Sequence, residues 1–422
     1  MEFLSFHRNV KIRIIVGFFQ RLISQMIIPF MAIYLANHFG AVNAGIMMLC
    51  VILSGVLVSF YGGHFSDLKG RKPILLISEF ANFIIFLLMA LVNSPWFFSP
   101  MITFILYAIL NAFISFSKPA LNAMIIDVST PKTRKAIYSI NYWTINLSFA
   151  IGAMLGAFFY HDYFFEVLLV ASISTLIIFF IYYVFVSESK PNAINDENLN
   201  PHNTIKNIIS SYRIVISDNV FIKFLFASII MMGIEFQLAN YISIRLTEEI
   251  GYTSPFSFIG VSHLISGVEI YGILRAENTI GVVVLGILLG GVFKLIPDYF
   301  RLYFGTLLFT VGYMFLGSSN NFWVLIIAML IVTLGELIYV PIQQTILSVI
   351  IDQNNRTRYM AVFGLNQNFG MMIASFFILI GGLLPQIVIS GFYGIMGIIA
   401  IFLFRNVFNQ KSYIKKMDSL IS

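Results

Sequence analysis

The stretch Gly63-His64-Phe65-Ser66-Asp67-Leu68-Lys69-Gly70-Arg71-Lys72 is a short charged segment between two long apolar runs. It has the pattern G-x-x-x-D-x-x-G-R-K. Gly63 permits close backbone packing at the end of one helix, and Gly70 supplies a turn. Asp67 can cap the next helix or pair with the two cations that follow the turn. The pattern is typical of a loop that joins two membrane helices on the cytoplasmic side.

The composition of the whole chain indicates that its solvent is a bilayer. Of 422 residues, 59% are hydrophobic and 10% are charged, and the mean hydropathy is +0.89. Soluble proteins carry about 25% charged residues. A membrane helix needs about 20 apolar residues, and the chain has about twelve such runs. The runs are continuous rather than alternating, which favours helices over a barrel. Cys50 is the only cysteine, so we expect neither a disulfide nor a metal site built on thiolates.

Lys and Arg residues set the expected topology. They gather in alternate loops and at the two ends, which predicts cytoplasmic termini in a cell membrane and makes the net charge of +6 a topology signal rather than a sign of nucleic-acid binding. The intervening loops hold only Arg245 and Arg275. The first run has no small-residue cleavage site, so we expect it to remain as a span. The expected spans lie near residues 13–36, 43–65, 73–93, 101–125, 137–160, 164–186, 219–245, 274–296, 301–318, 322–350, 360–383 and 386–405.

One long polar stretch divides the chain between its sixth and seventh spans. It predicts a six-helix bundle over 1–186, a cytoplasmic linker over 187–218, a second six-helix bundle over 219–408 and a cytoplasmic tail over 409–422. The part of the linker from 205 to 216 has the pattern of an amphipathic helix on the inner membrane surface. Residues 247–273 form a long outer loop that is irregular, helical or re-entrant.

The two predicted bundles echo each other in sequence. Gly62-Gly63-His64-Phe65 recurs as Gly290-Gly291-Val292-Phe293, after the second span of each half. Ile125-Ile126-Asp127 recurs as Ile350-Ile351-Asp352, after the fourth span of each half. Two echoes in register favour an internal duplication of a six-helix unit.

The loop pattern, the two halves and the linker together resemble the major facilitator superfamily over nearly the whole chain. That resemblance implies an all-α membrane protein of twelve helices in two bundles with pseudo-two-fold symmetry. In this fold the loop motif, with Gly63, Asp67, Gly70, Arg71 and Lys72, works as a gate that braces the two halves. Asp127 with Arg134 and Asp352 with Arg356 are then structural partners of the gate.

Further motifs resemble the proton-coupled multidrug antiporters of the lactococcal type, a drug:proton branch of the superfamily. The motifs in the fourth and fifth spans are Asn122 to Asp127 and Tyr142-Trp143, and that of the tenth is Thr333 to Tyr339. The resemblance implies that Glu336 serves cation recognition and proton coupling. Two acids of that branch are replaced or displaced: Asn141 precedes the Tyr-Trp pair, and Ala239 stands in the seventh span with Glu235 one turn earlier.

Ionisable residues inside spans are the candidates for transport, because each costs at least ~2.5 kcal/mol to insert without a partner or a task. They are Arg21, Glu79, Lys118, Glu235 and Glu336. Arg21 and Glu336 lie at similar depths, and in the implied fold a pair between them is plausible. The alternatives stay open: Glu336 as a structural acid, Arg21 as an internal counter-ion, Lys118 snorkelling to the surface, and Glu79 packing against a neighbouring helix. Polar or amphipathic residues that we expect to line the pocket are Tyr142, Trp143, Asn146, Asn240, Tyr339, Gln343, Asn366 and Gln367.

These observations predict a secondary transporter that works by alternating access as a monomer among membrane lipid, driven by the proton gradient without a cofactor or metal. Export of amphipathic, cationic drugs is the first reading. Export of a zwitterionic or anionic metabolite, such as a metallophore or a peptide-like compound, is the second, because Arg21 and Lys118 are cations and two acids are lost. A membrane enzyme or a nucleotide-driven pump is disfavoured, since the sequence has no HExxH, GxSxG or Walker A pattern.

Overall fold

A computed structural model describes residues 6–128, 131–189, 215–255, 264–293, 296–351 and 356–409, and most of them are helical. The chain divides by internal contacts into two units. The N-terminal unit comprises Met1–Ile194 together with Tyr271–Ala276. The C-terminal unit comprises Asn195–Ile270 and Glu277–Ser422.

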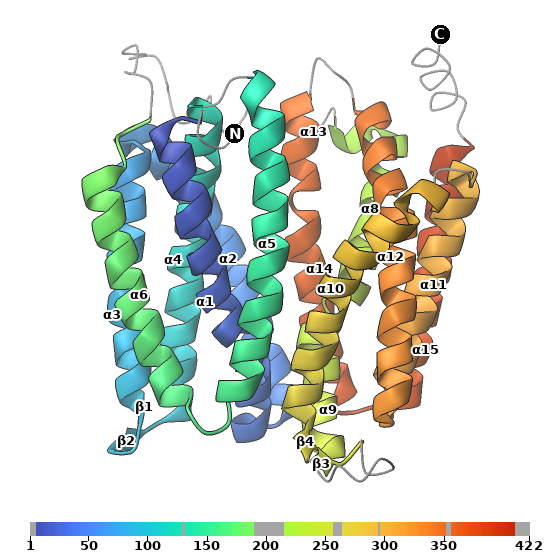
Figure 1. The fold of residues 1–422 in the computed structure, drawn as a ribbon, viewed down its shortest axis with the longest axis horizontal. Coiled ribbons are helices and arrows are strands. Elements are labelled where there is room, and N and C mark those ends of the chain that lie inside the picture. Colours follow the sequence, from blue (N-terminus) through green and yellow to red (C-terminus); the bar gives the residue numbers. More distant parts are fainter. Residues whose placement is uncertain are drawn as a thin grey trace. The chain divides into compact units, whose positions relative to one another are not determined.

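Long helices that are antiparallel in sequence order build the N-terminal unit (Figure 1). A short antiparallel hairpin of β1 (Asn93–Ser94) and β2 (Phe97–Phe98) joins the third to the fourth. The first helix packs against the fifth, the second against the fourth, and the third against both the fourth and the sixth. The helices are α1 (Arg8–Phe39), α2 (Ala41–Lys69), α3 (Arg71–Val92), α4 (Pro100–Asp127), α5 (Pro131–Phe159) and α6 (Phe164–Phe185).

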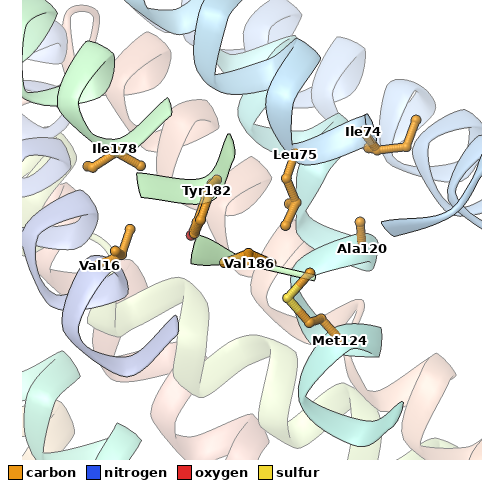
Figure 2. Packing of buried hydrophobic residues seen from close by; sticks show 8 residues of the cluster. All are labelled: Val16, Ile74, Leu75, Ala120, Met124, Ile178, Tyr182 and Val186. Atoms are coloured by element: carbon orange, nitrogen blue, oxygen red, sulfur yellow. The ribbon is translucent and has the colours of Figure 1, made fainter. Parts of the chain in front are cut away.

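Figure 2 shows an apolar cluster that holds four of these helices together. Val16 comes from α1, Leu75 from α3, Met124 from α4 and Tyr182 from α6, and none is more than 3% exposed. Because lipid is as apolar as these side chains, close packing rather than exclusion of water stabilises such a cluster. Its other members are Ile74, Ala120, Ile178 and Val186.

The C-terminal unit begins with an interrupted helix. Its main packing contacts join α11 to α12 and α15, and α8 to α14 and α15. A second short antiparallel hairpin pairs β3 with β4. The elements are α8 (Asn219–Glu235), η2 (Leu238–Ile242), α9 (Ser243–Ile250), β3 (Tyr252–Thr253), β4 (Ile265–Ser266), α10 (Gly267–Phe293), α11 (Asp298–Ser318), α12 (Phe322–Ile350), α13 (Arg356–Phe363), α14 (Asn366–Gly381) and α15 (Gln386–Phe408).

Each of the twelve predicted spans overlaps a described helix, although α10 is not among the helices that length and composition mark as apolar spans. Nine helical segments of the described residues are long and apolar enough to cross a membrane, and two shorter apolar ones are Thr144–Phe159 and Asn366–Gly381. Each expected span falls on one helix or on consecutive pieces of one. The prediction for 322–350 coincides with α12, whose first turn is capped by the Asn321 side chain.

Several local expectations were wrong. The second span does not end near Gly63: α2 continues to Lys69, and Gly70, with φ of 96°, makes the turn alone. The close approach belongs to Gly62, where an added Cβ would collide with the main-chain carbonyl of Phe116, whereas one on Gly63 would lie 3.8 Å from Pro119. For the outer loop, the open alternative of a helical part is confirmed, because α10 starts at Gly267.

The two cations assigned to outer loops are also helical. Arg245 lies in α9 and is 2% exposed, and Arg275 lies in α10 with its guanidinium 5.7 Å from the ring centroid of Phe149. The proposed amphipathic helix of the linker lies almost wholly outside the described residues, as does the tail beyond residue 409.

Candidate functional site

A break in the seventh span lies at the centre of the candidate site in the C-terminal unit. Regular α-helix stops at Glu235, and after a short turn the N–H of Ile242 donates to the carbonyl of Gln237 over 2.9 Å, a hydrogen bond of π-helical type. Interruptions of this kind are frequent at functional sites and form binding sites in many transporters. The sequence predicts one continuous span here, so the break is a finding of the structure.

Side chains satisfy the backbone carbonyls around this break. Gln237 Nε2 donates to the carbonyl of Gly233 over 2.9 Å, and Asn240 Nδ2 donates to that of Phe236 over 2.8 Å. Tyr313 Oη, from α11, donates to the main-chain oxygen of Glu235 over 2.9 Å. Asn240, a predicted pocket residue, therefore uses its amide N–H to hold the helix. The backbone is fixed at this point by bonds from within the span and from a neighbouring helix.

Glu336 on α12 accepts a hydrogen bond from a residue that the sequence did not single out. Asn278 Nδ2, on α10, donates to Glu336 Oε2 over 3.0 Å and to Thr333 Oγ1 over 3.1 Å. The Thr333 hydroxyl donates in turn to the carbonyl of Met329 over 2.9 Å, which leaves its oxygen lone pair for Asn278. Gly281 lets the helices approach, since a Cβ there would lie 3.0 Å from Thr333 Cγ2.

Tyr339 is the shared neighbour of the two predicted acids. It is 3% exposed, and the charges of Glu235 and Glu336 both act on its hydroxyl. Its ring meets that of Phe309 edge to face, with the centroids 5.3 Å apart. Gly335 permits this packing, because a Cβ there would lie 2.5 Å from the backbone nitrogen of Phe309. The site thus combines carboxylates, an amide, a hydroxyl and aromatic rings.

Glu277 is an acid of this unit that the sequence reading passed over. Both carboxylate oxygens are buried and have no hydrogen-bond partner among the described residues. A span that starts at 274 would put Glu277 in its first turn, where an acid is unremarkable. Because α10 starts at Gly267, Glu277 lies about 15 Å along the helix. The sequence feature that could have identified Glu277 as a candidate is an acid that is followed by a long apolar run.

A second polar cluster lies inside the N-terminal unit. Arg13 Nη1 donates to Gln20 Oε1 over 3.1 Å, and Gln20 Nε2 donates to Glu79 Oε1 over 2.6 Å. Tyr182 Oη donates to Gln20 Oε1 over 3.4 Å. Glu79 is 3% exposed, so Gln20 relays between a buried acid and a cation. This arrangement gives Glu79 a defined structural role.

Arg21 pairs with the residue that replaces an acid of the multidrug branch. Its Nη2 donates to Asn141 Oδ1 over 2.8 Å, while its Nη1 is buried without a hydrogen-bond partner among the described residues. A Cβ on Gly17 would lie 2.5 Å from Arg13 Nη1 and 3.4 Å from Arg21 Nη1, so the two guanidinium groups approach each other over this glycine. A pair between Arg21 and Glu336 would join the two units and stays a prediction.

The loop motif uses partners that the sequence did not assign. Glu188 caps α3, because its carboxylate accepts from the backbone N–H groups of Arg71 over 2.9 Å and Lys72 over 3.0 Å. Capping was one of the two roles predicted for Asp67, whose backbone is helical within α2 and whose side chain lies outside the described residues. Arg71 Nε lies 3.3 Å from Asp127 Oδ2, so Asp127 pairs with the loop motif.

The remaining predicted residues lie in different environments. Lys118 is exposed beside Pro119 in α4, and Gln367 is exposed in α14, whereas Asn366 is buried. Gln343 Nε2 donates to Ser228 Oγ over 2.9 Å. No group of three or more His, Cys, Asp or Glu in the described part of the chain is placed to hold a metal ion. Outside the described residues lie Asp352 and the side chains of Asp67, Arg134, Tyr142, Trp143 and Arg356.

Known proteins are similar to this chain in sequence and in fold. The model of the Major Facilitator Superfamily matches residues 14–375. A Na(+), Li(+), K(+)/H(+) antiporter of Planococcus maritimus is 30% identical over 379 residues, covering 89% of this chain and 89% of that protein. The crystal structure of a POT family transporter in complex with 5-aminolevulinic acid gives a TM-score of 0.72 at 15% identity, covering 98% of this chain and all of that one. A nucleoside transporter gives 0.68 at 11% identity, covering 96% and 100%.

These likenesses confirm the predicted fold class, an all-α membrane transporter, and the likeness to the solved structures concerns the fold alone. They also make the protein a secondary transporter rather than an enzyme. The drug:proton branch and the substrate stay predictions. With the family model matching most of the sequence, the chain belongs to the Major Facilitator Superfamily.

Proposed function

We propose that this transporter is a proton-coupled antiporter that exports a cation by alternating access. The observation that carries the proposal is the position of Glu336, a carboxylate inside α12 bonded to the neutral amide of Asn278 beside the Thr333 hydroxyl. An acid in the interior of a membrane protein is by default a functional group. The proton and the cargo cation would occupy this carboxylate in turn, so that one must leave before the other binds.

A small monovalent metal ion is the cargo that we favour. Hard cations prefer oxygen ligands, and the carboxylate of Glu336 and the hydroxyl of Thr333 offer two oxygens that share the Asn278 amide as their hydrogen-bond donor. The relative from Planococcus maritimus is a Na(+), Li(+), K(+)/H(+) antiporter. The positions of Lys and Arg support cytoplasmic termini in a cell membrane. Export and a monomeric working unit belong to the same proposal.

Amphipathic organic cations are the second candidate cargo. The specific observation is the aromatic wall next to the acids, with Tyr339 stacked edge to face on Phe309 and Tyr313 bonded to the backbone of Glu235. Aromatic faces attract organic cations, at ~0.5–2 kcal/mol per contact. The resemblance of the tenth-span motif to multidrug antiporters supports the same cargo class.

Transport by purified protein in liposomes with an imposed pH gradient tests the proposal. The cargo panel is Na⁺, Li⁺, K⁺ and ethidium, and proton movement is followed with a pH-sensitive dye trapped inside. We expect at least one of these cations to release protons, and Glu336→Gln to abolish the release while the protein stays folded. Glu248→Gln, an exposed acid of α9, is the matched control. Full exchange by Glu336→Gln, or no exchange with any of the four cations, would refute the proposal.

A further inference from the structure

Glu277 is an acid of α10 whose carboxylate lacks a hydrogen-bond partner among the described residues. Both of its oxygens are buried and unbonded among the described residues. Asn278 is the next residue, but successive residues of a helix point about 100° apart. Asn278 and Glu336 therefore form one cluster on α10 and α12, and the side chain of Glu277 leaves the helix in another direction.

Charged side chains on α10 and on the neighbouring α12 have other partners among the described residues. On α10 itself, the carboxylate of Glu269 accepts from Ser266 over 2.7 Å, and Arg275 lies over the ring of Phe149. On α12, which packs against α10 at Gly281, Glu336 accepts from Asn278. None of the ion pairs of the described residues includes Glu277. An ionised carboxylate in this position would have neither a counter-charge nor a hydrogen-bond donor.

A proton neutralises such a carboxylate and a metal ion does not. A buried charge without a partner costs far more than a buried neutral carboxyl group, so the group takes up a proton instead. A metal ion needs several oxygen ligands at once, and no second polar atom lies within hydrogen-bond distance of Glu277. Glu336 shares the Asn278 donor with the Thr333 hydroxyl, so a second oxygen ligand for a cation lies close to it.

We propose that Glu277 is a second proton-carrying site, separate from the exchange site at Glu336. In the described conformation the group is a neutral carboxyl. When the site opens to water on the inner side, the O–H bond breaks, the electron pair stays on the carboxylate and the proton goes to water. Water on the outer side supplies the next proton. This proposal rests on the proposed antiport and adds a consequence: each cycle brings in a proton at Glu277 besides the one exchanged at Glu336, so exchange against Na⁺ moves net charge.

Electrical recordings test this consequence. Proteoliposomes adsorbed on a solid-supported membrane receive a Na⁺ concentration jump, and the transported charge is divided by the Na⁺ flux measured in parallel. We expect about one net charge per Na⁺ in the wild type. Glu277→Gln should continue to exchange Na⁺ for protons with the charge per Na⁺ near zero, and Glu277→Asp should retain most of the charge. Glu248→Gln again serves as the control.

Two results would overturn the inference while leaving antiport intact: electroneutral exchange by the wild type, or an unchanged charge per Na⁺ in Glu277→Gln. An absence of cation exchange in the wild type would instead count against the proposed function. Infrared spectroscopy of the purified protein decides the protonation of Glu277 without transport. The band of a protonated carboxyl at neutral pH should be lost in Glu277→Gln, and a difference spectrum without that loss would contradict the proposal.

Discussion

Arg245 should be among the residues of the C-terminal unit whose loss costs most stability. It is 2% exposed and lies in α9, yet its guanidinium reaches three other segments. Nη2 donates to the carbonyls of Leu316 and Ser319, each over 2.8 Å, at the end of α11. Nη1 donates to Gln386 Oε1 over 2.9 Å at the start of α15, to Glu249 Oε2 over 3.1 Å, and to Asn320 Oδ1.

Replacing Arg245 with Met keeps most of the volume and removes all of these bonds. A buried acceptor left without its donor costs ~1–3 kcal/mol, and at least the Leu316 carbonyl lies far from water. The Glu249 carboxylate is 34% exposed, so water can replace much of what it loses. Breaking a buried charged network typically costs ~3–5 kcal/mol, which is our estimate for this substitution. For a unit of this size that corresponds to a fall in Tm of about 10 °C.

Heating of detergent-purified protein, followed by size-exclusion chromatography, measures the change in Tm. Glu249→Gln removes one partner of the network and leaves its centre, so it should lower Tm by only about 2 °C, from a loss of ~1 kcal/mol or less. Arg245→Lys should fall between the two, because an ammonium group cannot match the fork of the guanidinium. If Arg245→Met lowers Tm by no more than Glu249→Gln does, the reasoning is refuted. The network around Arg245 would then stabilise the protein no more than a surface ion pair.

Two further predictions concern the N-terminal unit. Gly62→Ala should destabilise the protein by ~1–3 kcal/mol, because the added Cβ would collide with the Phe116 carbonyl. Gly63→Ala, the control, should leave the stability unchanged. Equal Tm values for the two variants would show that α2 and α4 do not approach at Gly62. Gln20→Leu should lower the stability by ~2–4 kcal/mol, because Glu79 and Arg13 lose the amide that bonds to both. Phe19→Leu, at the exposed neighbouring residue, should leave the stability unchanged. A wild-type Tm in Gln20→Leu would contradict the bridging role of Gln20.

Hydropathy predicts helices well where their ends carry local signals, and it fails where an end is set by distant residues. The predicted span at 322–350 coincides with α12, whose start is fixed by a local signal, the Asn321 side chain that caps its first turn. The start of α10 was misplaced by seven residues, since Gly267 and Glu269 read as loop and only the β3 and β4 hairpin shows where the helix begins. The break after Glu235 lies in an apolar stretch, and one of the bonds that hold it comes from Tyr313 on another helix.

The candidate site was predictable by residue type and not by partnership. Glu235 and Glu336 stand out in sequence because an acid in an apolar run is rare. Asn278 carries no such signal, because placing a neutral amide inside a membrane costs less free energy than placing a charge there. Its contact with Glu336 also joins residues that lie 58 positions apart in the sequence. The pairing of Arg71 with Asp127 spans 56 residues and is likewise set by how α3 and α4 pack.

The hydrogen bonds of Glu79 and of Glu336 respond differently to protonation of the acid. Glu79 is linked through Gln20 to the cation Arg13, so protonating it would leave that cation without its counter-charge. The bond from Asn278 to Glu336 makes no such demand. An amide N–H donates to a carboxylate oxygen, and it can still donate to the carbonyl oxygen once the other oxygen carries a proton. The Asn278 contact can therefore persist whether or not Glu336 carries a proton, as the proposed exchange at this carboxylate requires.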